Sequence, residues 1–179
     1  MGAACHFNAK IATMLAFLKT LFSPKISNAA IAWQAAGNEA GRDYWLYASP
    51  VHLVLQRDSF SLAAPAPLPL EKDEIDTLTI ALNKHFEADK LQFFWHKNTW
   101  LLRLEANPSI QTSAPEVALN KDISSFLPTG EGAMQWASFS NEIQMLLFEH
   151  SVNQAREAKR LPIINSIWCY GGGQVDHAN

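Results

Sequence analysis

The spacing of hydrophobic residues changes several times along the first third of the chain, and each spacing predicts a different element. In 10–22 the apolar residues recur at intervals of three and four, which aligns them along one stripe of an amphipathic helix. A short helix is expected over 29–36. The stretch 44–56 is rich in aromatic and β-branched residues, which favour a strand, and a break is expected at Pro50. Residues 59–63 follow as a partner strand.

The middle of the chain predicts a helix and then a β-hairpin. Residues 71–86 begin with acidic side chains, which suit the positive end of a helix dipole. Two apolar runs, 91–97 and 100–105, are joined around Asn98 and predict the hairpin. A long connector, 106–133, follows, and one short helix is expected in it. The predicted buried stripe of the helix is Ile75, Leu78, Leu82 and Phe86.

A last helix and a closing strand complete the pattern. The helix is expected to begin near Met134 and to end before Pro162, and the apolar run 163–170 predicts a strand. Ser151 opens a sequence that matches a capping box, so the helix is expected to break at His150 and restart. The element order βαββαβ predicts an α+β fold of the ferredoxin-like split βαβ type, an antiparallel sheet with helices on one face.

The predicted elements divide the chain into one folded domain with two flanking segments. We expect an N-terminal helical extension over 1–43, an α+β domain over 44–173, and a frayed tail or truncation point at 174–179. The chain has 179 residues, of which 48% are hydrophobic and 17% charged, a composition typical of one globular domain.

Charge and cysteine content indicate which partners are unexpected and which cellular compartment is favoured. A net charge of −3, with 14 Lys plus Arg and no basic run, argues against nucleic acid as a partner. The apolar run near the N-terminus is too short to span a bilayer, so no membrane partner is predicted. Cys5 and Cys169 have no zinc or redox spacing, which favours a reducing, cytoplasmic compartment. Cys169 is predicted to be a buried small hydrophobe.

The polar residues of the last helix and strand give the candidate site. Asn165 shares a strand face with Ile163 and Ile167, so its side chain should be largely buried and paired, because an unpaired buried amide costs about 1–3 kcal/mol. In one interpretation Asn165, Asn153 and Gln144 form a structural network. In the other, a nearby arginine binds a carboxylate or phosphate. The candidate ligand-binding residues are Gln144, His150, Asn153, Arg156, Asn165, Gly171 and Gly173.

Catalytic and metal-binding signatures are not recognisable. None of the six histidines has a partner at the i, i+4 spacing of a zinc site, and there is no G-x-S-x-G nucleophile elbow. The glycines 171–173 follow a strand but lack the Lys-Ser/Thr of a phosphate-binding loop, so a flexible exit from the sheet is favoured. We therefore predict no catalytic residue, no metal and no cofactor.

Several separated motifs resemble one protein family. The chain is similar, over roughly 40 to 173, to proteobacterial regulatory proteins of the RpfE type, which are often labelled cofactor-independent phosphoglycerate mutases. Ser49 and Lys121 depart from the family, which tends to have Ala-Asp-Pro and Arg-Asp at these places. The matching motifs are 44–46, 50–53, 85–86, 127–130, 141–146, 150–153, 156–157, 165–168 and 171–173.

The sequence and the resemblance together leave two alternative functions. The first is a non-catalytic ligand- or partner-binding domain of a cytoplasmic bacterial protein, with a regulatory role. The alternative is a phosphoglycerate mutase-like or phosphatase-like enzyme whose metal-binding half is absent from this chain. Such chemistry needs metal ions, their Asp and His ligands and a Ser nucleophile. The expected partners are an anionic small molecule, such as a phosphate or carboxylate, and a second copy of the chain or a C-terminal half.

Overall fold

The computed structural model describes residues 28–175, so the helix expected over 10–22 lies outside the described residues. The domain is built on a four-stranded sheet with the order β4-β5-β1-β6, in which all neighbouring strands are antiparallel. The α+β class predicted from the element order is confirmed. The strands are β1 (Tyr44–Val51), β4 (Gln92–His96), β5 (Thr99–Leu104) and β6 (Ser166–Gly173).

The central strand, β1, is buried on both faces. Its side chains alternate, so that Leu46 packs in one core and Trp45 in another on the opposite face. The break expected at Pro50 is wrong, because the strand continues to Val51. Pairing of β1 with β5 ends at Ala48, and Pro50 pairs only with β6, so its missing N–H removes no bond on the β5 side.

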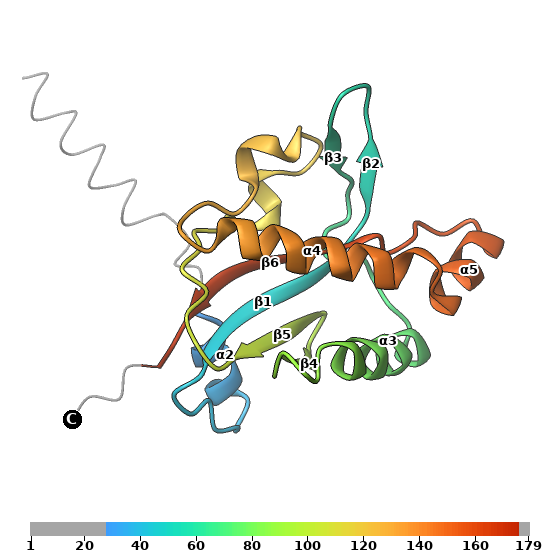
Figure 1. Cartoon of the computed structure of the whole chain (residues 1–179). Helices are drawn as coiled ribbons and strands as arrows, with labels where there is room; N and C mark the ends of the chain where they lie inside the picture. The colour runs from blue at the N-terminus through green and yellow to red at the C-terminus, as the bar shows by residue number, and fades with distance from the viewer. Residues whose placement is uncertain (1–27, 176–179) are drawn as a thin grey trace, which may run out of the picture.

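Two long helices cover the first face, which we call the α3/α4 face (Figure 1). They are α3 (Lys72–His85) and α4 (Ala133–Phe148). The indole N–H of Trp100 in β5 donates to Thr79 Oγ1 of α3 at 2.8 Å, which fixes the helix on the sheet. The core on this face includes Leu46, Leu78, Leu82, Phe93, Leu102, Trp136, Ile143 and Leu147.

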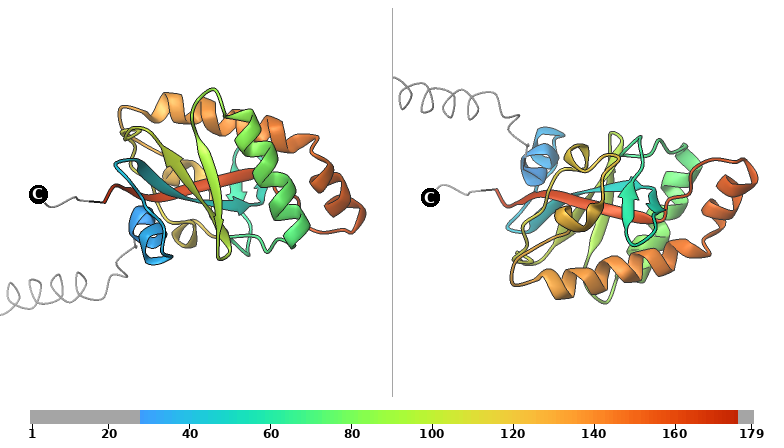
Figure 2. Two further views of the ribbon diagram at one scale, coloured as in Figure 1. Left: turned by 90° about the horizontal axis from the view of Figure 1, so that it is seen from below. Right: turned by 90° about the horizontal axis from the view of Figure 1, so that it is seen from above.

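The opposite face, which we call the α2 face, is covered by a shorter helix and by the long connector. Figure 2 shows α2 (Ala29–Ala35) and α4 on opposite sides of the sheet. Trp33 of α2 lies with its ring 5.3 Å from the ring of Trp45 and 5.0 Å from that of Phe94. The short helix expected over 29–36 is therefore confirmed, and aromatic packing holds it on the sheet.

A small ribbon and two helical turns lie beside the main sheet. The ribbon pairs β2 (Leu53–Leu55) with β3 (Phe60–Leu62) and projects from the domain in Figure 1. This confirms the partner strand expected over 59–63. The connector contains two 3-10 helices instead of the single short helix expected, η1 (Pro115–Val117) and η2 (Ile123–Phe126).

The last helix breaks where expected but is capped differently. Helix α5 (Ser151–Ala158) follows α4, and its N-cap is His150, whose Nδ1 accepts from the N–H of Val152 at 3.2 Å. The capping box expected at Ser151 is therefore wrong. Ser151 is already the first helical residue, so its hydroxyl is one position too late to cap. The helix ends at Ala158, before Arg160 takes the left-handed conformation.

The outer strand β4 is held by an asparagine from α3. Asn83 Nδ2 donates to Phe93 O at 3.0 Å, and its Oδ1 accepts from Phe93 N–H at 2.7 Å. One side-chain amide therefore replaces the backbone partner that an edge strand lacks. We call this two-bond contact between one asparagine side chain and one backbone residue an amide clamp. Within the described residues, no helix is long and apolar enough to cross a membrane.

Candidate functional site

The residues expected to converge on Asn165 do not meet there. Asn165 is half-buried and forms an amide clamp on β2, because its Oδ1 accepts from Leu53 N–H at 2.7 Å and its Nδ2 donates to Leu53 O at 2.8 Å. The expected contacts with Asn153 and Arg156 are therefore wrong. Asn165 lies just before β6, where the chain passes the ribbon, and this placement could not be read from strand alternation.

Asn153 forms a second clamp close by. Its Oδ1 accepts from Ile164 N–H at 2.8 Å, and its Nδ2 donates to Ile164 O at 2.7 Å and to Leu147 O at 2.8 Å. Asn153 thus ties α5 to the end of α4 and to the segment that enters β6. Gln144 is exposed on α4 and takes no part. The side-chain amides of Asn153 and Asn165 therefore bond to backbone atoms and not to each other.

Arg156 is buried and already holds a carboxylate of its own chain. Its Nη1 lies 2.8 Å from Glu74 Oε2, and its Nε donates to Pro162 O at 2.7 Å. The same Glu74 oxygen accepts from Glu71 N–H at 2.9 Å, at the start of α3. An incoming anion would meet a neutralised guanidinium, so the geometry does not favour the anion site expected here.

The glycine run belongs to the sheet. Gly171 and Gly173 lie in β6, so the flexible exit expected there is wrong. Gly171 has a φ of 63° beside an irregularity in the pairing with β1, a conformation that favours glycine. A side chain at Gly173 would collide with Asn28, which packs against this strand. Cys169 is buried as predicted, and burial raises the pKa of its thiol to about 12.

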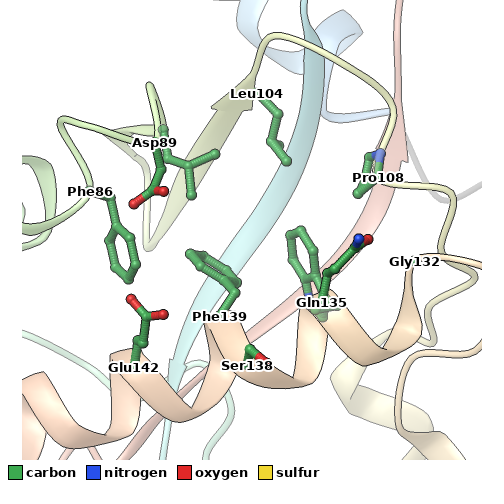
Figure 3. A pocket seen from close by; sticks show the side chains of 11 residues that line it. Phe86, Asp89, Leu104, Pro108, Gly132, Gln135, Ser138, Phe139 and Glu142 are labelled. Atoms are coloured by element: carbon green, nitrogen blue, oxygen red, sulfur yellow. The ribbon is translucent and has the colours of Figure 1, made fainter.

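A pocket of about 350 Å³ opens elsewhere, between the end of α3, α4 and the end of the sheet. Figure 3 shows the carboxylates of Asp89 and Glu142 at one end of it, on either side of the Phe86 ring, and Gln135 and Pro108 at the other. The side chains lining it are Phe86, Asp89, Leu91, Leu104, Pro108, Gln135, Trp136, Ser138, Phe139 and Glu142, with Gly132.

Aromatic rings form the walls of this pocket. The Phe139 ring lies 5.0 Å from that of Phe86 and 4.8 Å from that of Trp136, measured between ring centres. Phe86 and Trp136 are almost fully buried, so the rings are held by the core and do not need a ligand to order them. Within residues 28–175, no acceptor takes the indole N–H of Trp136, whereas Trp100 donates to α3.

The charge of the pocket is negative. Asp89 and Glu142 line it, and no Lys or Arg does. His85 is the nearest ionisable partner, with its Nε2 3.6 Å from Glu142 Oε2 and both side chains well exposed. A pocket that combines aromatic walls with carboxylates favours a cationic group on an apolar body.

The end wall depends on a close approach of the connector to α4. Gly132 packs against the backbone of Pro108, where any side chain would collide with the Pro108 carbonyl. The bridge between Gln111 and Thr129 closes the same loop with backbone bonds of 2.7 and 3.1 Å. The connector therefore folds back on itself and shapes one end of the pocket.

Sequence patterns contained only part of this site. Phe86 was predicted on the buried stripe of its helix, and its ring forms part of the pocket wall. Asp89 and Glu142 carry no pattern of their own, because exposed carboxylates next to helices are common and only the tertiary packing brings these two together.

Comparison with known proteins adds no family. No family model, no curated protein and no solved structure matches the chain. Within residues 28–175, no group of three or more His, Cys, Asp or Glu side chains is placed to hold a metal ion.

Proposed function

We propose that this protein is a non-catalytic binding domain whose α3/α4 pocket takes a small organic cation, an ammonium or guanidinium group on an apolar body. One observation carries this proposal. Asp89 and Glu142 both line one end of a pocket with aromatic walls, and no Lys or Arg lines that pocket. The volume of about 350 Å³ is within the range of small-molecule sites.

The physical chemistry of the pocket favours a cation in two ways. A cation within about 6 Å of an aromatic ring gains roughly 0.5–1 kcal/mol at an exposed site. Two carboxylates at one end of the pocket add Coulombic attraction, which salt weakens because the site is open to solvent. An anion of the same shape would be repelled by the same carboxylates.

The proposal also covers the ferredoxin-like fold type and the resemblance to RpfE-type proteins. The strand order supports a ferredoxin-like split βαβ fold, because β5 lies between β1 and β4 and β1 lies between β5 and β6. Membership of the RpfE-type family, a regulatory role and a cytoplasmic location stay predictions. A binding pocket suits a regulatory domain, and nothing in residues 28–175 adds support to the phosphoglycerate mutase-like alternative.

The test uses three probes that share one apolar body and differ in charge: phenethylammonium, phenethyl alcohol and hydrocinnamate. Amide-resolved NMR titration should show phenethylammonium perturbing the amides around Asp89 and Gln135, with a Kd on the order of 1–10 mM. Phenethyl alcohol should bind there more weakly, and hydrocinnamate should not bind there. Equal perturbation by all three probes would contradict the proposal.

Isosteric variants then test the carboxylates. Glu142→Gln and Asp89→Asn should each weaken phenethylammonium binding about 3- to 10-fold and leave phenethyl alcohol unchanged, because only the Coulombic attraction is removed. Glu157→Gln is the matched control, since Glu157 is exposed on α5 away from the pocket, and it should bind as wild type does. If Glu142→Gln and Asp89→Asn also bind as wild type, the carboxylates do not hold the cation.

A further inference from the structure

A second pocket, of about 410 Å³, lies on the α2 face and has the opposite chemistry. Its floor is the sheet, its roof is α2, and its mouth is the turn between β4 and β5. Three alanines on or next to α2 leave the space open. The residues lining it are Ala32, Ala35, Ala36, Tyr47, His96, Lys97, Asn98, Thr99 and Tyr170.

The floor is a pair of tyrosines set by strand register. Tyr47 of β1 lies opposite Tyr170 of β6, and their rings stack with centres 5.2 Å apart and an angle of 26°. Burial raises the pKa of Tyr170, while a hydrogen bond with Ser49 acts in the opposite direction. The phenol therefore keeps its proton at neutral pH and remains a hydrogen-bond donor.

Buried hydroxyls connect to this phenol. Ser49 is fully buried, and its Oγ lies 3.0 Å from Thr99 Oγ1, which in turn donates to Trp100 O over a long 3.3 Å. If Tyr170 turns its O–H toward a ligand, Ser49 can donate to the phenol oxygen and Thr99 can donate to Ser49. Only the long bond from Thr99 to Trp100 O is lost. The chain of hydroxyls from Thr99 through Ser49 therefore lets Tyr170 donate its O–H into the pocket at little cost in free energy.

The charge at the mouth is positive. Lys97 lies in the turn with a φ of 57°, beside His96 and Asn98, and no carboxylate lines the pocket. Burial and then the charge of Lys97 lower the pKa of His96, so Lys97 is the cation at neutral pH. Glu116 is the acidic group whose charge reaches Tyr170, and it lies outside the lining.

We infer that this second pocket binds a small carboxylate with a flat apolar body, which Lys97 attracts, the Tyr170 hydroxyl orients and the alanines of α2 cover. The anion expected from the sequence is thereby assigned to the α2 face and not to Arg156. The pocket is distinct from the cation site, because the two lie on opposite faces of the sheet and share no lining residue.

Hydrocinnamate is the probe, and phenethylammonium is its charge-reversed control. In amide-resolved NMR titration, hydrocinnamate should perturb the amides around Lys97 and Ala35 and leave those around Asp89 unchanged, with phenethylammonium giving the reverse pattern. Perturbation of the α3/α4 pocket by hydrocinnamate, or of neither pocket, would overturn the inference.

Three variants locate the interaction. Tyr170→Phe and Lys97→Gln should each weaken hydrocinnamate binding about 3- to 10-fold, since each loses one hydrogen bond or one charge. Ala32→Leu, which adds bulk at a half-buried position of the roof, should abolish hydrocinnamate binding while phenethylammonium still binds. Retained phenethylammonium binding shows that the variant is folded.

Matched controls remove the same groups elsewhere. Tyr44→Phe deletes a phenol oxygen on the α3/α4 face, and Lys159→Gln removes an exposed charge after α5. Both should bind hydrocinnamate as wild type does. If these controls weaken binding as much as Tyr170→Phe and Lys97→Gln, the pocket is not the site and the inference is wrong.

Discussion

The two faces of the sheet bury different kinds of side chain. On the α3/α4 face, the strands contribute apolar residues to one large core. On the α2 face, the cores are smaller, and three buried hydroxyls interrupt them, those of Ser49, Thr99 and Ser166. Each of these hydroxyl residues is next in sequence to a residue of the α3/α4 core, so strand alternation places it on the α2 face.

This difference should make the two faces contribute unequally to the free energy of unfolding. Polar contacts of the α3/α4 face fix its helices in place. Arg156 joins α5 to α3, and Asn83 ties α3 to β4. Trp100 of β5 donates to Thr79 of α3. The α2 face keeps its three buried hydroxyls toward one end of the sheet, at the starts of β5 and β6 and near the end of β1. A buried hydroxyl costs free energy unless it is bonded. The first face should therefore dominate the free energy of unfolding.

The largest expected effect distinguishes two ion pairs, Arg156–Glu74 and Arg103–Asp43. Arg156→Met should lower the free energy of unfolding by about 3–5 kcal/mol, because it leaves Glu74 as an unpaired carboxylate with little exposure. Arg103→Met, on the α2 face, should lower the free energy of unfolding by no more than about 1 kcal/mol. Arg103 Nε lies 3.2 Å from Asp43 Oδ2, but with an angle that gives no hydrogen bond and with about a third of each side chain exposed.

Urea unfolding of the two arginine variants under identical conditions measures this difference. If Arg156→Met and Arg103→Met lower the free energy of unfolding by similar amounts, the prediction is wrong, because the buried pair then contributes no more than the exposed one. Glu74→Gln is a useful companion, since it keeps an acceptor for Glu71 N–H while removing the charge.

The second effect compares neighbours on one strand. Leu101 and Leu102 of β5 are both fully buried, on the α2 face and the α3/α4 face respectively. Leu102→Ala should cost about 3 kcal/mol and Leu101→Ala about 2 kcal/mol, because the seven-residue α2 can shift toward vacated space more easily than α3 and α4 can. Denaturant titration gives both values, and a reversed order would contradict the distinction between the faces.

The smallest effect is a pH dependence from two histidines, His150 at the N-cap of α5 and His96 at the end of β4. Burial lowers the pKa of His150, and burial followed by Lys97 lowers the pKa of His96. Because each folded pKa lies below the ordinary value of about 6.5, folding favours the neutral form. This stabilisation is complete above that value and is lost as pH falls through the folded pKa.

Replacing either histidine should therefore flatten the acid side of the stability profile. His150→Asn retains a capping acceptor, and His96→Asn removes the second group, with each change on the order of a few tenths of a kcal/mol after solvent screening. Thermal unfolding across mildly acidic to neutral pH measures the slope. A profile that neither variant alters would show that acid destabilisation has another source.

Local patterns were enough for the long helices and most strands of the sheet but not for the contacts between them. The stripe ending at Phe86 and the hairpin around Asn98 follow from periodicity and turn residues, and both are confirmed. Pro50 misled the strand prediction, because whether its N–H is needed depends on which neighbouring strand is present. His150 was missed as a cap, since an imidazole acceptor is a less common capping group than the adjacent serine hydroxyl.

The candidate site was harder to predict for a related reason. Arg156 and Asn153 are buried, but their partners are backbone groups and Glu74, which lies 82 positions from Arg156 along the chain. No periodicity encodes such a partner. The two pockets arise from what surrounds them, including the small side chains of α2 and the tight approach at Gly132, so they exist only once the layers have packed.

The amide clamps of Asn83, Asn153 and Asn165 have a chemical consequence. Each uses both ends of the amide, a carbonyl that accepts and an NH₂ that donates to the same backbone residue. Aspartate has almost the same shape but no NH₂, and it would set a negative oxygen against a backbone carbonyl. Deamidation at any of the three would therefore release the strand or helix end that the clamp holds.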